Sequence, residues 1–554
     1  MHAGKTGAAL TRRSLLRATA TATAAAGALA SARVHAAAPT FTPDWESLIG
    51  GYRAPGWFRD AKFGIWAHWT AQCVPEAGDW YARNMYVQGH AQYTHHLKTY
   101  GHPTQVGFME MNHRWRAENW DPGALLDLYV RAGAKYFVAL ANHHDNFDNY
   151  ESKYHGWNST RIGPRRDLVG LWAEAARQRG LRFGVSNHSG NAWHWFQTAY
   201  GYDAQGPLAG RRYDAFRLTA ADGKGTWWEG LDPQDLYTGR NMVIPDGFTD
   251  AKAAAEWHAA NDGVWHVPPP AHNPAFTRRW FLRCRDLIDR YRPDLLYFDN
   301  DGLPLGQAGM DIAAHFYNAS RAWHGGRLEA VLNTKGLQGD RRLAVVEDVE
   351  RGSRDDIQPH PWQTDTCIGD WHYSRSVFEN HQYKSAATVL HILCDVVSKN
   401  GNLLLSVPLK ADGTIDSDER QTLEGLAAWM ARHGEAIHGT RPWRRFGEGP
   451  TVVKGGAMSE QPATPFTAQD IRFTTRGDAL HAIGLGWPQD GVMRVQSLAQ
   501  DSAFAPGSID RVEVVGAAGS LPFKRTRQGL EVRVPEGLAG SPAIALKVFG
   551  RGLA

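Results

Sequence analysis

The chain has 554 residues, and its composition excludes several classes of protein. Hydrophobic residues make up 43% and charged residues 21%, which excludes intrinsic disorder and supplies apolar material for a large core. An α/β barrel of roughly 200 to over 400 residues with a smaller second domain fits this length best. The 22 tryptophans suit either large cores or a sugar-binding cleft, since both use flat apolar rings.

The first 38 residues have the pattern of an export signal. They carry five basic residues and no acid, so the net charge of +3 becomes −2 without them. Thr11-Arg12-Arg13-Ser14-Leu15-Leu16 is a twin-arginine pattern, and an Ala/Thr-rich run and small-residue cleavage options follow it. We therefore expect a twin-arginine signal over residues 1–38 and a bacterial protein that is periplasmic or secreted.

The rest of the chain offers no signature of a nucleic-acid or membrane protein. A balance of −2 gives no electrostatic drive toward nucleic acid or an anionic membrane, so we expect neither partner. No later run approaches the roughly 20 apolar residues of a membrane span.

The four cysteines lie far apart without a C-x-x-C pair, which predicts neither a zinc site nor a disulfide framework. Cys284 and Cys394 fall in apolar helical patterns and are expected to be buried thiols.

Short apolar, β-rich runs alternate with amphipathic helical patterns between residues 63 and 407. This alternation predicts an α/β fold of parallel βαβ units, and about eight units predict a closed (β/α)8-type, TIM-like barrel. The predicted strands are 63–68, 105–110, 135–141, 181–187, 294–298, 328–334, 343–348 and 402–407, and the predicted helices are 123–133, 167–180, 276–291, 311–323, 385–399 and 417–434. No helix fits between 328–334 and 343–348, so either the barrel is irregular there or one of these two strands is wrong.

Two other regions complete the predicted organisation. Segment 189–275 lies between two barrel strands and is rich in Trp, Gly, Pro and Asp, which predicts a large active-site loop or small subdomain. After Gly439 the pattern changes to short alternating runs separated by turn signals. We therefore expect a catalytic barrel domain over 39–440 and a small C-terminal antiparallel β-sandwich over 441–554.

Polar residues follow five of the predicted strands at the end where a barrel holds its active site. They are His68, Asn142 to Asp145, His188, Asp299 to Gly302, and Asp348 to Gly352. Histidines and carboxylates from five strands thus converge on one rim of a Trp-rich protein. This combination predicts glycoside hydrolysis, in which one carboxylate attacks the anomeric carbon and another serves as acid and then as base.

The two carboxylate roles are assigned by position. Asp299 is the preferred nucleophile because it ends a rigid strand and faces the barrel axis, whereas Asp301 lies further into the loop. Glu350 is the preferred acid/base, ahead of Glu347 and Asp348, because a proton shuttle benefits from a loop position whose environment can change between steps.

No metal and no cofactor are predicted. Adjacent histidines such as His143 and His144 would point to opposite faces of a strand, and neither HExxH nor HxH spacing occurs. A nucleotide cofactor is unsupported, because no G-x-G-x-x-G follows a strand and no Walker loop is found.

Several stretches together resemble the family 29 glycoside hydrolases, the retaining α-L-fucosidases. They are 57–69 (WFRDAKFGIWAHW), 78–86 (GDWYARNMY), 143–145 (HHD), 163–169 (GPRRDLV), 293–299 (PDLLYFD) and 400–407 (NGNLLLSV). The likeness covers roughly residues 45–440, and a C-terminal β-sandwich is also usual in the family. It implies a retaining exo-hydrolase that removes terminal α-L-fucose from an oligosaccharide or glycoconjugate.

The resemblance also implies roles for individual residues. It places the nucleophile at Asp299 and places Tyr297 in the lining of the sugar site. Contacts with the fucose hydroxyls are implied for His68, Asp79, Trp80, His143, His144 and His188, the last at a position where other members carry Tyr. Imidazoles can donate to and accept from hydroxyls, which agrees with this assignment.

The sequence also departs from the family pattern. Thr70, Asp79, Asn142, Asn146, Asn300 and Gln363 stand where Gly, Glu, Lys, Gly, Gly and Glu are common. These departures leave open a related sugar such as L-galactose, and with it another exo-glycosidase on the same barrel. A non-catalytic carbohydrate-binding protein is the alternative from another class, and it is disfavoured because binding needs neither Asp299 nor Glu350.

Overall fold

We describe a computed structural model in which residues 1–2, 4, 40–264, 273–462 and 464–553 are placed. The predicted export signal over 1–38 lies outside these residues apart from positions 1–2 and 4. Phe41–Ala554 form one compact unit. In the placed part of the chain, no helix combines the length and the apolar character needed to cross a membrane.

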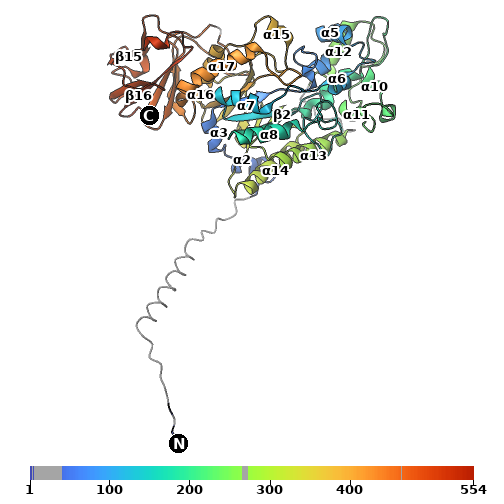
Figure 1. Cartoon of the computed structure of the whole chain (residues 1–554), viewed down its shortest axis with the longest axis horizontal. Helices are drawn as coiled ribbons and strands as arrows, with labels where there is room; N and C mark the ends of the chain where they lie inside the picture. The colour runs from blue at the N-terminus through green and yellow to red at the C-terminus, as the bar shows by residue number, and fades with distance from the viewer. Residues whose placement is uncertain (3, 5–39, 265–272, 463, 554) are drawn as a thin grey trace. The chain divides into compact units, whose positions relative to one another are not determined.

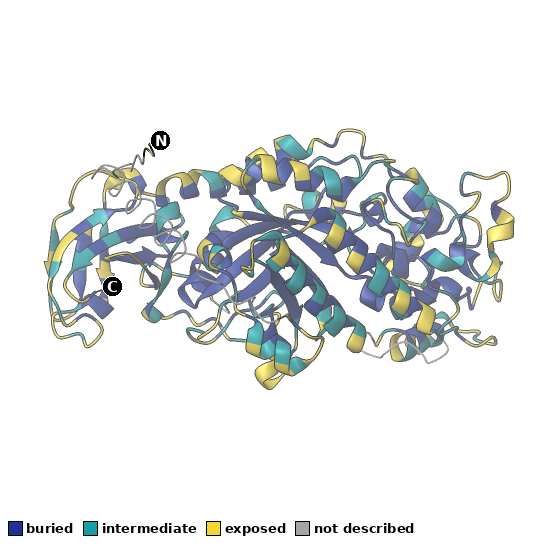
Figure 2. Cartoon of the chain, turned by 90° about the horizontal axis from the view of Figure 1, so that it is seen from below, coloured by how far each residue is buried: buried dark blue, intermediate teal, exposed yellow. Residues whose placement is uncertain are grey.

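Eight parallel strands form the central sheet (Figure 1). They are β1 (Phe63–Ala67), β2 (Tyr136–Asn142), β3 (Arg182–Asn187), β4 (Leu295–Asp301), β5 (Val331–Lys335), β6 (Val346–Glu347), β7 (Trp362–Cys367) and β8 (Gly401–Ser406). Their order is β6-β5-β4-β3-β2-β1-β8-β7. The two edges meet where Asp348 pairs with Gln363 and Val349 N donates to Gln363 O at 2.9 Å. The predicted (β/α)8-type barrel is therefore confirmed, and its strands are buried along most of their length (Figure 2).

The six predicted helices are present around this sheet. They are α7 (Pro122–Arg131), α8 (Leu168–Gln178), α13 (Pro274–Tyr291), α14 (Gln307–Trp323), α16 (Ala386–Ser398) and α17 (Ser417–His433). Side chains of Asp121, Asp167 and Asn273 cap the first turns of α7, α8 and α13. Shorter helices are α2 (Trp45–Gly51), α3 (Gly56–Ala61), α4 (Tyr81–Asn84), α5 (Ala91–Thr99), α6 (Phe108–Arg114) and α15 (Arg375–Glu379).

Three strand predictions need correction or completion. The predicted strand 105–110 is wrong, because α6 begins at Phe108 and a short apolar run does not separate helix from strand. Strand β7 was not predicted, since its sequence WQTDTC is polar although all six residues are buried. Between β5 and β6 a 3-10 helix (Gly339–Ala344) stands in for an α-helix, so the barrel is irregular there and both strands exist.

Segment 189–275 consists of short helical elements where it is described, and residues 265–272 lie outside the described part. Its α-helices are α9 (Ala192–Trp195), α10 (Asp214–Arg217), α11 (Pro233–Leu236) and α12 (Ala251–Asn261). Trp195 and Phe196 of this segment are buried in the main core together with barrel side chains, whereas Tyr202, Ala204, Ile244 and Ala254 form a small separate cluster.

One side chain of the barrel depends on a glycine in the neighbouring strand. Tyr136 on β2 pairs with Gly64 on β1, and a Cβ atom at residue 64 would overlap the Tyr136 ring. With no side chain there, the Tyr136 hydroxyl donates to Gln363 Oε1 on β7 at 3.1 Å. Gln363 Nε2 then donates to Asp348 Oδ1 at 2.9 Å, which ties β2 to the seam of the barrel.

From Arg441 onward the chain forms two antiparallel sheets, as predicted. The strands are β9 (Arg441–Glu448), β10 (Ile471–Arg476), β11 (Ala479–Gly484), β12 (Val492–Val495), β13 (Ile509–Val514), β14 (Phe523–Arg525), β15 (Leu530–Arg533) and β16 (Ile544–Gly550). Their orders are β13-β16-β11-β10-β9 and β12-β15-β14, and apolar side chains of both sheets share one core. Arg472 Nε is 2.7 Å from Asp395 Oδ1 of α16, which joins these sheets to the barrel helices.

Candidate active site

A pocket of about 420 Å³ lies at the carboxyl ends of the barrel strands, and each strand from β1 to β7 contributes to it directly or through the loop that follows. It is lined by Trp66, His68, Asp79, Trp80, His143, His144, His188, Asn191, Asp299, Asn300, Asp301, Lys335, Glu350, Asp365 and Trp371. All the predicted site residues except Tyr297 are therefore brought together. Their individual roles stay predictions.

Asp299 lies in an irregular part of β4 and is surrounded by positive or hydrogen-bonding groups. The register against β5 shifts between Tyr297 and Asp301, and such a bulge redirects the side chains within it. Asp299 Oδ2 is 3.1 Å from His188 Nδ1 and 3.3 Å from His144 Nε2. Burial raises the pKa of Asp299, but the charge of Lys335 and contacts with both histidines outweigh it and hold that pKa well below its usual range. The carboxylate is thus kept ionised, as a nucleophile requires.

Lys335, at the end of β5, joins the two proposed catalytic carboxylates. Its Nζ donates to Asp299 Oδ1 and to Glu350 Oε2, each at 2.6 Å. The two bound oxygens therefore lie no farther apart than twice that distance, a limit compatible with the separation of about 5–5.5 Å in retaining glycosidases. Burial lowers the pKa of Lys335, but the surrounding carboxylates, Asp299 foremost, raise it well above its usual value.

The rival carboxylates have other surroundings. Glu347 is 2.5 Å from Arg354 and lines a separate cavity of about 600 Å³. Asp348 is buried, accepts from Gln363 Nε2 at 2.9 Å and lies 3.4 Å from the Tyr297 hydroxyl, and burial next to Asp365 raises its pKa well above the usual range. The geometry therefore favours Glu350 as the partner of Asp299.

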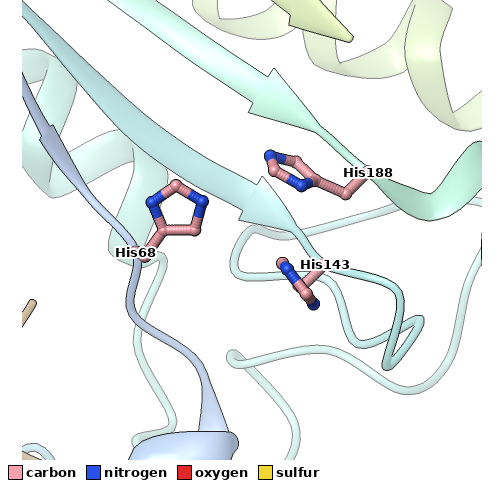
Figure 3. A group of neighbouring side chains, drawn as sticks. All are labelled: His68, His143 and His188. Carbon is pink, nitrogen blue, oxygen red and sulfur yellow. The ribbon is translucent and has the colours of Figure 1, made fainter. Parts of the chain in front are cut away.

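Three buried imidazoles project from the ends of β1, β2 and β3 toward a common space (Figure 3). The ring centre of His188 lies 5.4 Å from that of His68 and 4.9 Å from that of His143. Burial lowers the pKa of all three, to about 4 for His188, so the rings are neutral near pH 7. Neutral imidazoles both donate and accept, which suits sugar hydroxyl groups.

The same imidazoles lie close enough together to raise the question of a metal. Within the described residues, one ligand atom from each of His68, His143 and His188 lies within 4.8 Å of the others. The amide of Gln72 bears on this, because its Oε1 accepts from Ala82 N at 3.3 Å and its Nε2 faces His143 Nδ1 at 3.0 Å. His143 Nε2 then carries the hydrogen and acts as a donor, whereas a metal would need its lone pair.

The expectation that His143 and His144 point to opposite faces is wrong. Both residues lie beyond the last residue of β2, so strand alternation does not apply to them. Their ring centres are 4.4 Å apart, and both side chains line the pocket. His144 Nδ1 is 2.8 Å from the His188 carbonyl oxygen, which directs His144 Nε2 toward Asp299.

The remaining predicted binding residues have distinct environments. Asp79 lines the pocket, but its carboxylate accepts from the backbone N–H groups of Trp371 and His372 at 3.0 and 2.7 Å. Trp80 is 40% exposed and lies at the pocket wall. Tyr297 is buried behind the pocket surface, where its hydroxyl donates to Asp365 Oδ2 at 2.8 Å.

Sequence reasoning missed several lining residues. Asp365 was missed together with β7, and its burial raises its pKa to about 6. Lys335 directly follows the predicted strand 328–334. The rule that residues at the ends of barrel strands lie at the active site, which identified Asp299, therefore applies to Lys335 as well. Trp371 lies in a loop and Asn191 ends a short 3-10 helix (Ser189–Asn191), and neither has a sequence signal. The Trp371 ring centre is 4.9 Å from that of His68, and Asn191 Nδ2 donates to Asp299 O at 3.1 Å.

Comparison with known proteins relates the chain to the α-L-fucosidases. The Alpha-L-fucosidase family matches residues 28–435, and the Alpha-L-fucosidase C-terminal domain matches residues 464–548. The tissue alpha-L-fucosidase of Bos taurus is 27% identical over 470 residues, which cover 83% of this chain and 80% of that protein. That of Homo sapiens is 25% identical over 514 residues, with 92% and 91% covered. The crystal structure of Thermotoga maritima alpha-fucosidase in complex with fucose matches at a TM-score of 0.65 and 28% identity, covering 92% of this chain and all of that one. The chain therefore belongs to the α-L-fucosidase family of glycoside hydrolases.

Proposed function

We propose that this chain is an exported, retaining exo-glycosidase that hydrolyses terminal α-L-fucose from oligosaccharides or glycoconjugates. Family membership supports α-L-fucosidase activity. The observation that carries the mechanism is the arrangement of Asp299 and Glu350, which share the Lys335 ammonium group in one pocket.

The chemistry follows from the two carboxylates. Asp299 attacks the anomeric carbon and forms an ester bond to the sugar while the glycosidic C–O bond breaks. Glu350 gives its proton to the departing oxygen. In the second step Glu350 removes a proton from water, which attacks the anomeric carbon and releases Asp299. Two inversions leave the released fucose in the α configuration.

The surroundings supply recognition of a single terminal sugar. Buried, neutral His68, His143 and His188 offer donors and acceptors to ring hydroxyls. Trp66 and Trp371 also line the pocket and offer an apolar surface for the C5 methyl group of fucose.

The proposed export rests on residues 1–38 alone. The proposed division into a barrel domain over 39–440 and a sandwich domain over 441–554 rests on the change of sequence pattern near Arg441.

The test compares 4-nitrophenyl α-L-fucoside with 4-nitrophenyl α-L-galactoside as substrates of the purified protein. We expect a higher kcat/KM for the fucoside, and NMR of the first-formed sugar should show the α anomer. Asp299→Asn is the matched control, because it keeps the shape of the Asp299 side chain and removes the nucleophilic carboxylate. A β anomer would contradict the retaining mechanism, and preference for the galactoside would assign the related sugar instead.

A further inference from the structure

The loop that carries Glu350 is held by a segment from the C-terminal part of the chain. Residues 455–460, here called the brace segment, lie between β9 and β10 and run beside residues 350–353. Met458 N donates to the carbonyl oxygen of Glu350 at 2.9 Å. The main chain of the proposed acid/base is thus fixed by a residue more than a hundred positions later in the sequence.

A glycine makes this close approach possible. Ser353 N donates to Gly456 O at 3.2 Å, and Gly456 N donates to Ser353 O at 2.9 Å, so the two segments pair as antiparallel strands do. A Cβ atom at Gly352 would overlap the Gly456 carbonyl oxygen. Since the obstacle is backbone, any side chain at residue 352 would push the brace segment away.

The residue next to Glu350 is held in a costly conformation. Arg351 has φ +43°, in the left-handed region that non-glycine residues rarely adopt, and such a residue persists only when its surroundings determine it. Two backbone hydrogen bonds hold Arg351 in this conformation. Arg351 N donates to Asp365 O at 2.8 Å, and Glu460 N donates to Arg351 O at 2.9 Å. The direction in which the chain leaves Glu350 therefore depends on the brace segment.

Glu460 adds an ionic contact to these backbone bonds. Its carboxyl group is buried, and its Oε1 lies 3.2 Å from Arg351 Nε and 3.1 Å from Lys384 Nζ. Lys384 Nζ also donates to the carbonyl oxygen of Cys367, the last residue of β7, at 2.7 Å. One carboxylate thus links the Glu350 loop to the end of a barrel strand.

We propose that the brace segment positions Glu350 for proton transfer, with Glu460 as its main positioning residue. This inference rests on the proposed function, in which Glu350 protonates the leaving oxygen. Proton transfer requires the carboxyl group within hydrogen-bond reach of that oxygen, and a displacement of about 1 Å can reduce the rate by about 100-fold. The C-terminal part of the chain would then contribute to catalysis without touching the sugar.

The test uses the full chain and two substrates that differ in their need for an acid. Phenyl α-L-fucoside has a poor leaving group that must be protonated, whereas 2,4-dinitrophenolate leaves without a proton. For Glu460→Gln and for Gly352→Ala we expect kcat/KM on the phenyl fucoside to fall by about 10-fold or more. On the dinitrophenyl fucoside it should change by less than about 3-fold. Glu513→Gln is the matched control, because its carboxylate pairs with Arg511 on β13 at 2.8 Å, and it should change neither value.

The outcomes separate the brace from the proposed function. Equal losses on both fucosides would mean a general distortion and overturn the positioning role, as would no loss on either. Melting temperatures identify a variant that does not fold, in which case Glu460→Asp, which keeps the charge, should show the smaller but still leaving-group-dependent loss. A wild-type protein that hydrolyses neither fucoside would overturn the proposed function itself.

Discussion

Lys335 donates to Asp299 at 2.6 Å, so a half-buried cation is the nearest charged neighbour of the proposed nucleophile. Lys335→Met removes this charge at similar length and should raise the pKa of Asp299, because the ionised carboxylate loses its counter-ion. The acidic limb of the kcat/KM profile should therefore move to higher pH, and kcat should fall by about 100-fold.

Lys335→Arg is the control for this prediction, since it retains the positive charge and should keep the acidic limb close to that of the wild type. A Lys335→Met protein with an unchanged pH profile would mean that the lysine does not control the ionisation of Asp299.

Glu350→Ala should separate the two carboxylate roles. A dinitrophenolate leaves without protonation, so the fucosyl-enzyme still forms, but its hydrolysis slows for want of a base. Azide needs no deprotonation and should restore turnover with an α-fucosyl azide as product, which NMR identifies. Glu347→Ala is the comparison variant and should need no azide, because Glu347 faces Arg354 in another cavity. A β-fucosyl azide from the Glu350 variant would make Glu350 the nucleophile.

The buried histidines predict a loss of stability in acid. Burial depresses the pKa of His188 to about 4, against about 6.5 in the unfolded chain. Between these values the unfolded state binds more protons than the folded state. The contribution of neutral His188 to the free energy of unfolding is therefore fully present above about pH 6.5, and it declines as the pH falls toward about 4. His188 contributes up to about 2 kcal/mol of this decline at pH 5.

Thermal unfolding at pH 7 and pH 5 measures the effect. The fall in Tm between these two conditions should be smaller in His188→Gln than in the wild type. His381→Gln should leave it unchanged, because that imidazole is 79% exposed. An identical fall in all three proteins would assign the acid sensitivity to other groups.

The N-terminal pattern predicts the route of export. Replacing Arg12 and Arg13 by Lys should leave the precursor in the cytoplasm, because the twin-arginine pathway reads the guanidinium pair. Immunoblots of cytoplasmic and periplasmic fractions follow the protein. Undiminished export of the double variant would show that the signal belongs to another pathway.

The sequence predicted those elements whose side chains have one dominant environment. Strand β2 is buried along its whole length and reads as a continuous apolar run, and α13 shows a clear apolar face. Strand β7 was missed because its buried side chains are polar and satisfied by partners such as Tyr136 and Tyr297, which come from distant parts of the chain. Hydrogen bonding of this kind leaves no periodic trace in the sequence.

The candidate site shows the same division. Asp299 and His188 follow apolar strands and were found from the rule that barrel strands end at the active site. Asp365 was lost with its strand, and Trp371 depends on how a loop folds. The pairing of Glu350 with the brace segment joins residues about a hundred positions apart, which no local pattern encodes.

The Gly64–Tyr136 arrangement has an evolutionary consequence. The tyrosine ring occupies the volume that a side chain at position 64 would fill, so residue 64 cannot gain a side chain while residue 136 keeps its ring. Among relatives of this enzyme, an alanine or larger residue at the first position should accompany a smaller residue at the second. Positions 64 and 136 are therefore expected to covary in a family alignment. A relative with a large residue at both positions would have to place its aromatic ring elsewhere, and it would lose the hydrogen bond between residue 136 and Gln363.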